Sequence, residues 1–199
     1  MWKKLAFFIS FVLLSFSIDQ TFCGPIRRKD PKKIQSLNSL CRLLNYGEFN
    51  ERGIKTFTLN NPNEPIKKYQ TGYKNRVEYV RAVITFQAVQ NKGSPTNDAA
   101  RKYAREMGKS TDDAGHIIGN QLGGTGRSLY NIFPQSPNIN RGAWSREEKE
   151  IRNLVLTNKQ PIEVIVQLYY PTPTATRPNR FTYRTAYNNT CRSANVFNP

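Results

Sequence analysis

Apolar and polar residues alternate between positions 77 and 89, where Val, Tyr, Val, Ile and Phe are separated by polar residues. A period of two places the apolar side chains on one face of a β-strand, so this stretch predicts a long strand. Shorter β-branched and aromatic runs at 54–59, 162–169 and 180–187 predict three more strands, because such side chains pack well on a pleated surface.

Three other stretches are predicted to be helices. Apolar residues recur at helical spacing within 33–45, which is typical of an amphipathic helix. A capping residue at 96–98 precedes a stretch that continues to Met107, and the composition of 140–156 favours a third helix. With a glycine-rich loop at 119–126, this order indicates an α+β fold with a mainly antiparallel sheet and flanking helices.

The chain has 199 residues, enough for one domain with a core. Its apolar fraction of 38% predicts long polar loops. Lys and Arg total 30 against 14 Asp and Glu, which gives a formal charge of +16. A field this positive favours polyanionic partners, namely nucleic acid, heparin-like sugars or anionic membrane, and charge alone does not choose among them.

Residues 1–23 resemble a secretory signal peptide, because a basic flank precedes an apolar run too short and too terminal for a membrane span. Cleavage could follow Ser17 or Cys23, and cleavage after Cys23 leaves two cysteines. We therefore expect a secreted protein with one domain over residues 24–199, a basic lead-in and no later membrane span. Cys41 and Cys191 could form a disulfide in an oxidising compartment; two unrelated buried thiols are the alternative.

His116 is the single histidine of the chain. Imidazole has an ordinary pKa of about 6.5, so it can act as a general base near neutral pH. A histidine without a chemical task is the alternative interpretation. Gly115 permits a close backbone approach beside it, and Asp113 could accept a hydrogen bond that fixes the local strand or the imidazole.

A helix that begins near Asn140 places Trp144, Glu148 and Arg152 along one side, at steps of four residues. Asn and Glu oxygens are ligands that hard cations accept, and arginine suits a pair of phosphate oxygens. The stripe could hold Mg²⁺ against a phosphodiester while His116 takes a proton from water. Simpler interpretations are an N-cap at Asn140, an ordinary ion pair of Glu148 with Arg152 and a packing role for Trp144.

Two motifs carry a resemblance to a known family. The first is Asp-Ala-Gly-His at 113–116, and the second is Asn-Ile-Phe-Pro-Gln-Ser-Pro-Asn-Ile-Asn-Arg-Gly-Ala-Trp at 131–144, with a Glu four residues on. Together they resemble the DNA/RNA non-specific endonuclease family, which comprises secreted or imported nucleases of the ββα-metal superfamily. The specific part of the resemblance covers residues 113–152, and its spacing suits a strand, a loop, a second strand and then the helix.

The resemblance implies a role for each residue of the motifs. His116 matches the general base that activates a water, and Asn140 matches the ligand of a single catalytic Mg²⁺ that is otherwise bound mostly by water and phosphate oxygens. Glu148 matches the carboxylate that holds metal-bound water, although Glu147 beside it competes for this assignment. Arg152 matches the arginine that neutralises the phosphate. The supporting residues are Asp113, Asn131, Gln135 and Trp144.

The chain departs from the better-known members at Ala114, where they have Arg. The departure removes a positive donor near the scissile phosphate, and Arg141 or Arg127 could substitute for it. The resulting prediction is a secreted, Mg²⁺-dependent endonuclease, with Mn²⁺ as the alternative ion. Its substrates are DNA and RNA, and the resemblance implies 5′-phosphate products.

The rival interpretation is a catalytically weak or inactive basic secreted protein that binds nucleic acid or glycosaminoglycan, and Ala114 is its best support. A toxin or immunity-linked effector would use the same nuclease chemistry. A zinc site is disfavoured, because one His and two bridged Cys do not supply its usual ligands. The sequence indicates neither an oligomeric state nor a preference between DNA and RNA.

Overall fold

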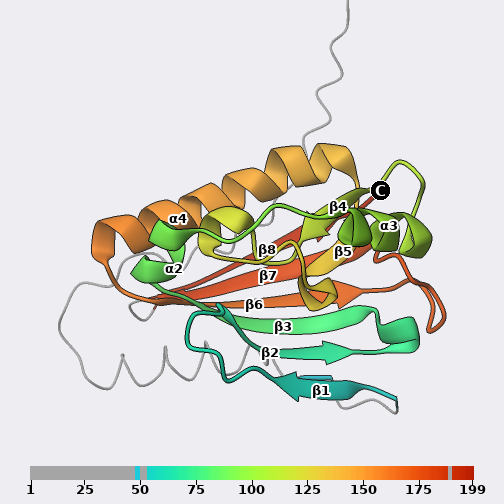
Figure 1. The fold of residues 1–199 in the computed structure, drawn as a ribbon, viewed down its shortest axis with the longest axis horizontal. Helices are drawn as coiled ribbons and strands as arrows, with labels where there is room; N and C mark the ends of the chain where they lie inside the picture. Colours follow the sequence, from blue (N-terminus) through green and yellow to red (C-terminus); the bar gives the residue numbers. More distant parts are fainter. Residues whose placement is uncertain (1–47, 50–52, 188–189) are drawn as a thin grey trace, which may run out of the picture.

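The computed structural model describes residues 48–49, 53–187 and 190–199. Its main element is a six-stranded antiparallel sheet in the order β1-β2-β3-β6-β7-β8. The helices lie together on one side of this sheet (Figure 1). The sheet strands are β1 (Lys55–Thr58), β2 (Ile66–Thr71), β3 (Val77–Ile84), β6 (Ile162–Tyr169), β7 (Arg180–Tyr187) and β8 (Thr190–Phe197). The α-helices are α2 (Phe86–Asn91), α3 (Asp98–Met107) and α4 (Ser145–Asn158).

The core lies between the sheet and the helices, because alternate residues of the central strands are apolar. Val80, Ala82 and Ile84 of β3 pair with apolar residues of β6 and are each 0% exposed. Ile151 and Val155 of α4 pack against the same cluster from the helix side. Burial of these side chains fixes the position of α4, the helix predicted to carry Glu148 and Arg152.

A second, two-stranded sheet carries the first sequence motif. β4 (Asp113–His116) pairs antiparallel with β5 (Ile132–Gln135), and the chain continues through the π-helix η4 (Ile139–Trp144) into α4. This order of strand, strand and helix confirms the predicted ββα arrangement and the α+β class. It places His116 at the end of β4 and Asn140 in the first turn of the helical segment.

The predicted strand at 77–89 is too long. β3 ends at Ile84 because Thr85 caps the next helix, where its side-chain oxygen accepts a hydrogen bond from the backbone N–H of Ala88 at 3.1 Å. The pattern also misses β2 and β8, whose many polar residues obscure the alternation. The other strands predicted between 54 and 187 agree with β1, β6 and β7, and the two helices predicted there agree with α3 and with η4 followed by α4.

Several predictions concern residues outside the described ranges, namely the signal peptide, the basic lead-in, the helix at 33–45 and Cys41. Cys191 lies on β8 opposite Ala186, and its bridge to Cys41 stays a prediction. Among the helices that the structure describes, none is long and apolar enough to span a membrane.

A buried ion pair fastens the chain just before β4 to the β6–β7 loop. Arg177 donates to both carboxylate oxygens of Asp112, at 2.7 and 2.9 Å, and the two side chains are 16% and 2% exposed. Burial alone would raise the pKa of Asp112, but hydrogen bonds from Arg177 and from the Lys109 backbone lower it below its ordinary value. The pair therefore stabilises the fold at neutral pH, and this contribution is lost as the pH falls through the lowered pKa.

Asp112→Ala should lower the free energy of unfolding by about 3–5 kcal/mol, because it leaves the Arg177 guanidinium buried without its anion. Urea denaturation at pH 7, followed by circular dichroism, measures the change. Asp98→Ala is the control, since the Asp98 carboxylate also pairs with an arginine but is 99% exposed, and its loss should leave the midpoint nearly unchanged. Equal shifts for the two variants would contradict the role assigned to burial.

Candidate active site

A polar groove of about 530 Å³ opens between the end of β4, the loop at 119–121 and the start of α4. The groove brings together the four residues to which the sequence motifs assign chemistry, namely His116, Asn140, Glu148 and Arg152. Its other lining residues are Lys92, Gly119, Asn120, Gln121 and Ser145.

His116 is held by a backbone carbonyl group. Its Nε2 lies 3.0 Å from the carbonyl oxygen of Ser94. Because a carbonyl oxygen only accepts, Nε2 carries the proton of the neutral ring and Nδ1 keeps the lone pair. Burial lowers the pKa of the imidazole below its ordinary value, although the bond to Ser94 opposes this. The ring is therefore neutral at pH 7, with Nδ1 as its basic atom.

Trp144 holds the backbone of His116. The indole is 2% exposed, and its Nε1 donates to the carbonyl oxygen of His116 at 3.1 Å. Its ring packs edge-to-face on Phe181 and Tyr183 of β7. Trp144 is thus a packing residue that also fixes the backbone of His116.

Asn131 fixes the chain that follows β4. Its carboxamide is fully buried and bonds both backbone groups of Ile118, accepting from the N–H at 2.8 Å and donating to the carbonyl at 3.0 Å. It also donates to the carbonyl oxygen of Thr125 at 2.9 Å. These bonds give Asn131 a supporting position, away from the groove lining.

Gln135 also lies outside the groove. It is 0% exposed on β5, in register with Asp113. Its carboxamide lies over Gly115, where a β-carbon would be 2.2 Å from Oε1, which explains the glycine in the first motif. Neither polar atom of this carboxamide has a hydrogen-bond partner in the described part of the chain.

The π-helix η4 brings two consecutive residues to one carboxylate. Asn140 Nδ2 donates to Asp113 Oδ2 at 2.9 Å, and Arg141 donates to both Asp113 oxygens at 2.9 and 2.7 Å. Asp113 therefore contacts the asparagine and not the imidazole. Burial alone would raise the pKa of Asp113, but the bonds from Arg141 and Asn140 lower it.

The bond to Asp113 orients the Asn140 carboxamide. Since Nδ2 is engaged, Oδ1 is the atom left to face a ligand in the groove, and an amide oxygen suits a hard cation. The N-cap interpretation of Asn140 is not supported, because Asn138 occupies the cap position of η4 and no side-chain cap bond forms there.

Glu148 is the acidic residue of the groove. Burial raises its pKa to about 8, although hydrogen bonds from Gln121 and the Gly119 backbone oppose this. Its Oε1 is buried and has no hydrogen-bond partner among the described residues. Gly119 provides the space, because a β-carbon there would lie 2.3–2.4 Å from the carboxyl group. Glu147 instead accepts a hydrogen bond from Arg192 at 3.1 Å, so only Glu148 lines the groove.

Lys92 and Arg152 are the cations of the groove. Within the described ranges Arg152 forms no ion pair with Glu148, so the simple interpretation of an i,i+4 pair is not supported. Ala114 packs against an apolar cluster that includes two alanines of α3. Arg141 is engaged by Asp113, and Arg127 is not among the lining residues.

Sequence reasoning missed Ser94 and Gln121 as contributors to this site, and it did not single out Lys92 among the other basic residues. Ser94 acts through its carbonyl oxygen, which leaves no side-chain signal. Lys92 resembles many other basic residues in the sequence, and its left-handed backbone, with φ of 57°, is visible only in the structure. Gln121 lies in the glycine-rich loop that the sequence did identify.

A family model described as DNA/RNA non-specific endonuclease matches residues 58–188, more than half of the chain. The chain belongs to this family. The matched stretch includes every residue that lines the groove. Membership confirms the expected family.

One curated relative is a probable deoxyribonuclease RhsA of Dickeya dadantii (strain 3937). It is 52% identical over 63 residues, which are 32% of this chain and 4% of that protein, so the chain spans a small part of the relative's length. A structure of the Sda1 nuclease with bound zinc ion has a TM-score of 0.48 and 13% identity over 75% of this chain and 85% of its own. NucA from Streptococcus agalactiae with magnesium ion bound has a TM-score of 0.43 and 11% identity, over 77% and 75% respectively.

Gly119→Ala should displace the Glu148 carboxyl group, because the new β-carbon would lie 2.3–2.4 Å from it. The carboxyl group ends a flexible side chain, so the thermal midpoint should change little while plasmid cleavage in Mg²⁺ falls about tenfold to 100-fold. Gly142→Ala is the control, since a β-carbon there meets nothing within 4 Å. Unchanged cleavage by the Gly119 variant would show that the position of Glu148 does not matter.

Proposed function

We propose that this chain is a secreted, Mg²⁺-dependent endonuclease that hydrolyses phosphodiester bonds of DNA and RNA and leaves 5′-phosphates. The observation that carries the proposal is that His116 and Asn140 line one groove together with Glu148 and Arg152. A proton acceptor, an orienting oxygen for a cation, a carboxylate and a guanidinium are the groups that hydrolysis of a phosphodiester requires.

The groove fits a hard divalent cation that keeps most of its water. No three His, Cys, Asp or Glu side chains gather as a metal site in the described part of the chain, which leaves Asn140 Oδ1 as the direct protein ligand. The buried Glu148 Oε1, which lacks a protein partner among those residues, can accept a hydrogen bond from a water on such an ion. Mg²⁺ dehydrates reluctantly and is therefore suited to this donor set, and Mn²⁺ prefers similar oxygen ligands. When bound, the ion would neutralise charge on the phosphate and on the departing oxygen.

His116 supplies the proton acceptor. Its Nδ1 takes a proton from the water that attacks phosphorus, and the Ser94 carbonyl oxygen, 3.0 Å from Nε2, stabilises the imidazolium that results. A bond forms between the water oxygen and phosphorus while the bond from phosphorus to the 3′ oxygen breaks, so the phosphate stays on the 5′ side. Lys92 and Arg152 balance the charge of the phosphate and thereby replace the cation absent at Ala114.

Secretion is part of the proposal and is supported by the basic and apolar pattern of residues 1–23. A Cys41–Cys191 bridge would suit that compartment. The formal charge of +16 supports binding to the phosphate backbone of either nucleic acid, since contacts to phosphates depend little on sequence.

His116→Ala and Asn140→Ala should each lower cleavage of plasmid DNA and of RNA in Mg²⁺ by about 100-fold or more, because they remove the proton acceptor and the cation ligand. EDTA should abolish cleavage by the parent protein, and Mn²⁺ should restore it. Asn158→Ala, at the exposed far end of α4, should cleave normally. Digestion by either site variant at the parent rate would refute its role, and a parent that retains DNA without cutting would favour the rival binding protein.

The pH dependence of kcat/KM should follow the fraction of His116 that carries a neutral imidazole. Because burial holds the pKa of His116 below its ordinary value of 6.5, the base is available above that lowered pKa and is lost as the pH falls through it. The acid limb of kcat/KM should therefore have its midpoint below pH 6.5. A midpoint above pH 7 in saturating Mg²⁺ would mean that another group controls the reaction.

A further inference from the structure

Three aromatic rings from three separate elements form one continuous stack. Phe57 of β1 and Tyr69 of β2 lie with ring centroids 4.8 Å apart and planes 12° apart. Tyr69 and Tyr130, which precedes β5, lie 4.9 Å and 20° apart. We call these three residues the aromatic stack. Near-parallel rings at this spacing cover each other's faces, so only the outer face of a ring at the end of the stack can be open.

The stack lies on the helix side of the sheet. Phe57 pairs with Tyr69, and Tyr69 pairs with Val80. Residues paired across neighbouring strands point to the same face, and Val80 belongs to the core beneath the helices. The stack therefore shares its side of the sheet with the groove.

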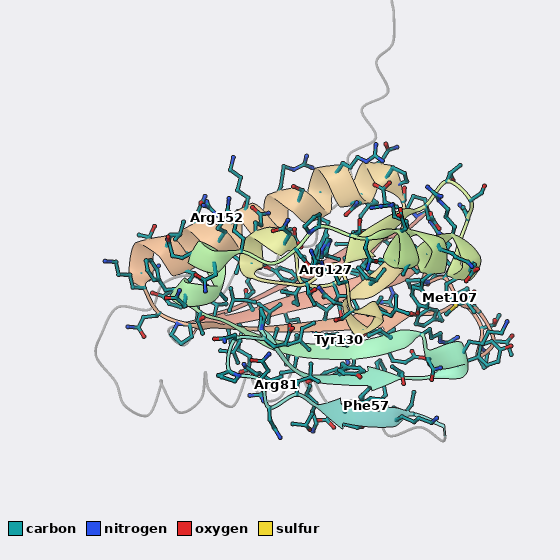
Figure 2. All side chains as sticks on the ribbon, in the orientation of Figure 1. Phe57, Arg81, Met107, Arg127, Tyr130 and Arg152 are labelled. Carbon is teal, nitrogen blue, oxygen red and sulfur yellow. The ribbon has the colours of Figure 1, made fainter. Side chains whose placement is uncertain are left out.

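The outer end of the stack is exposed. Phe57 is 41% exposed on β1, an edge strand whose four residues are all exposed. Leu129, beside Tyr130, is 44% exposed. In Figure 2, Phe57, Tyr130 and Arg127 follow one another from β1 toward the loops between the sheet and α4. An exposed Phe at the end of a stack offers a free ring face to a planar partner.

The charges around the stack favour an anionic partner. Lys55 on β1 and Arg127 before Tyr130 are exposed and pair with no carboxylate of the described residues. The nearby carboxylate of Glu64 accepts a hydrogen bond from the Tyr130 hydroxyl group at 3.1 Å. An exposed aromatic ring near cations that have no carboxylate partner among the described residues suits an unpaired base on a phosphate backbone.

The inner end of the stack is tied to the site by hydrogen bonds of Asn131. Tyr130 is followed by Asn131, whose carboxamide holds the backbone of Ile118 and Thr125. Ile118 in turn lies between His116 and Gly119, which both line the groove. The inner ring of the stack is thus next in sequence to the residue that holds the backbone between His116 and Gly119.

We propose that the aromatic stack is a platform for the unpaired bases of single-stranded nucleic acid, which stack on the exposed ring of Phe57 on the same side of the sheet as the groove. The proposal rests on the proposed nuclease function only in taking the bound strand to be substrate. A duplex already stacks and pairs its bases, so it cannot use the exposed face of Phe57 in this way. The platform therefore gives the protein a preference for single strands.

Binding to a fluorescein-labelled single-stranded DNA of mixed sequence, and to its duplex, tests the platform. Fluorescence anisotropy in EDTA excludes cleavage, so the parent protein itself can be used. Phe57→Ala should weaken single-strand binding about fivefold or more and leave duplex binding unchanged, whereas Phe57→Trp should bind the single strand at least as well as the parent. Phe197→Ala removes a Phe that is 66% exposed on the opposite edge strand and should change neither affinity.

Equal losses on both probes, or no loss on the single strand, would overturn the platform. So would a dimer that depends on Phe57 in analytical ultracentrifugation while oligonucleotide binding is unaffected, because the ring would then serve self-association of edge strands. The nuclease proposal is judged separately by plasmid cleavage in Mg²⁺. If the parent protein does not cut plasmid but Phe57→Ala still weakens binding to the single strand, the nuclease function is refuted and the platform is supported.

Discussion

The groove depends on the position of one buried indole. Trp144 lies at the junction of η4 and α4, packs against Phe181 and Tyr183 of the large sheet at 5.0 and 5.1 Å between ring centroids, and donates to the carbonyl oxygen of His116. The large sheet, the β4–β5 sheet and the helical segment therefore meet at a single side chain. An apolar replacement could fill the space, but it would leave the His116 carbonyl without its donor and the base without its tie to the helix.

Burial drives the two titratable groups of the groove toward their neutral forms. It lowers the pKa of His116 and raises that of Glu148 to about 8, because a low dielectric disfavours either charge. The neutral imidazole is the form that accepts a proton. The neutral carboxyl group is the wrong form for holding a hydrated cation, and the cation itself would favour ionisation. Binding of a divalent ion in the groove would therefore favour release of a proton from Glu148.

The site residues that could be predicted from the sequence act through their side chains and lie close together along the chain. Asn140, Glu148 and Arg152 share a helical segment, and the strand–strand–helix order brings His116 to its start. Ser94 could not be found, because its contribution is a backbone carbonyl placed by the fold.

The remaining differences between the predicted and the observed structure have two causes, a local capping interaction and contacts between distant parts of the chain. The alternation beyond Ile84 predicts a strand, but the capping bond of Thr85 starts a helix there. The aromatic stack joins three elements that are distant along the chain, so no window of sequence contains its signal.

The π-helical turn η4 carries both a core residue, Trp144, and a groove residue, Asn140. A regular helix advances by about 100° per residue, and within the wider turn of η4 both Asn140 and Arg141 reach Asp113. Deleting one residue between them and Trp144 would keep the indole in the core and rotate the carboxamide out of the groove. The deletion would therefore leave the core intact and take Asn140 away from His116, Glu148 and Arg152.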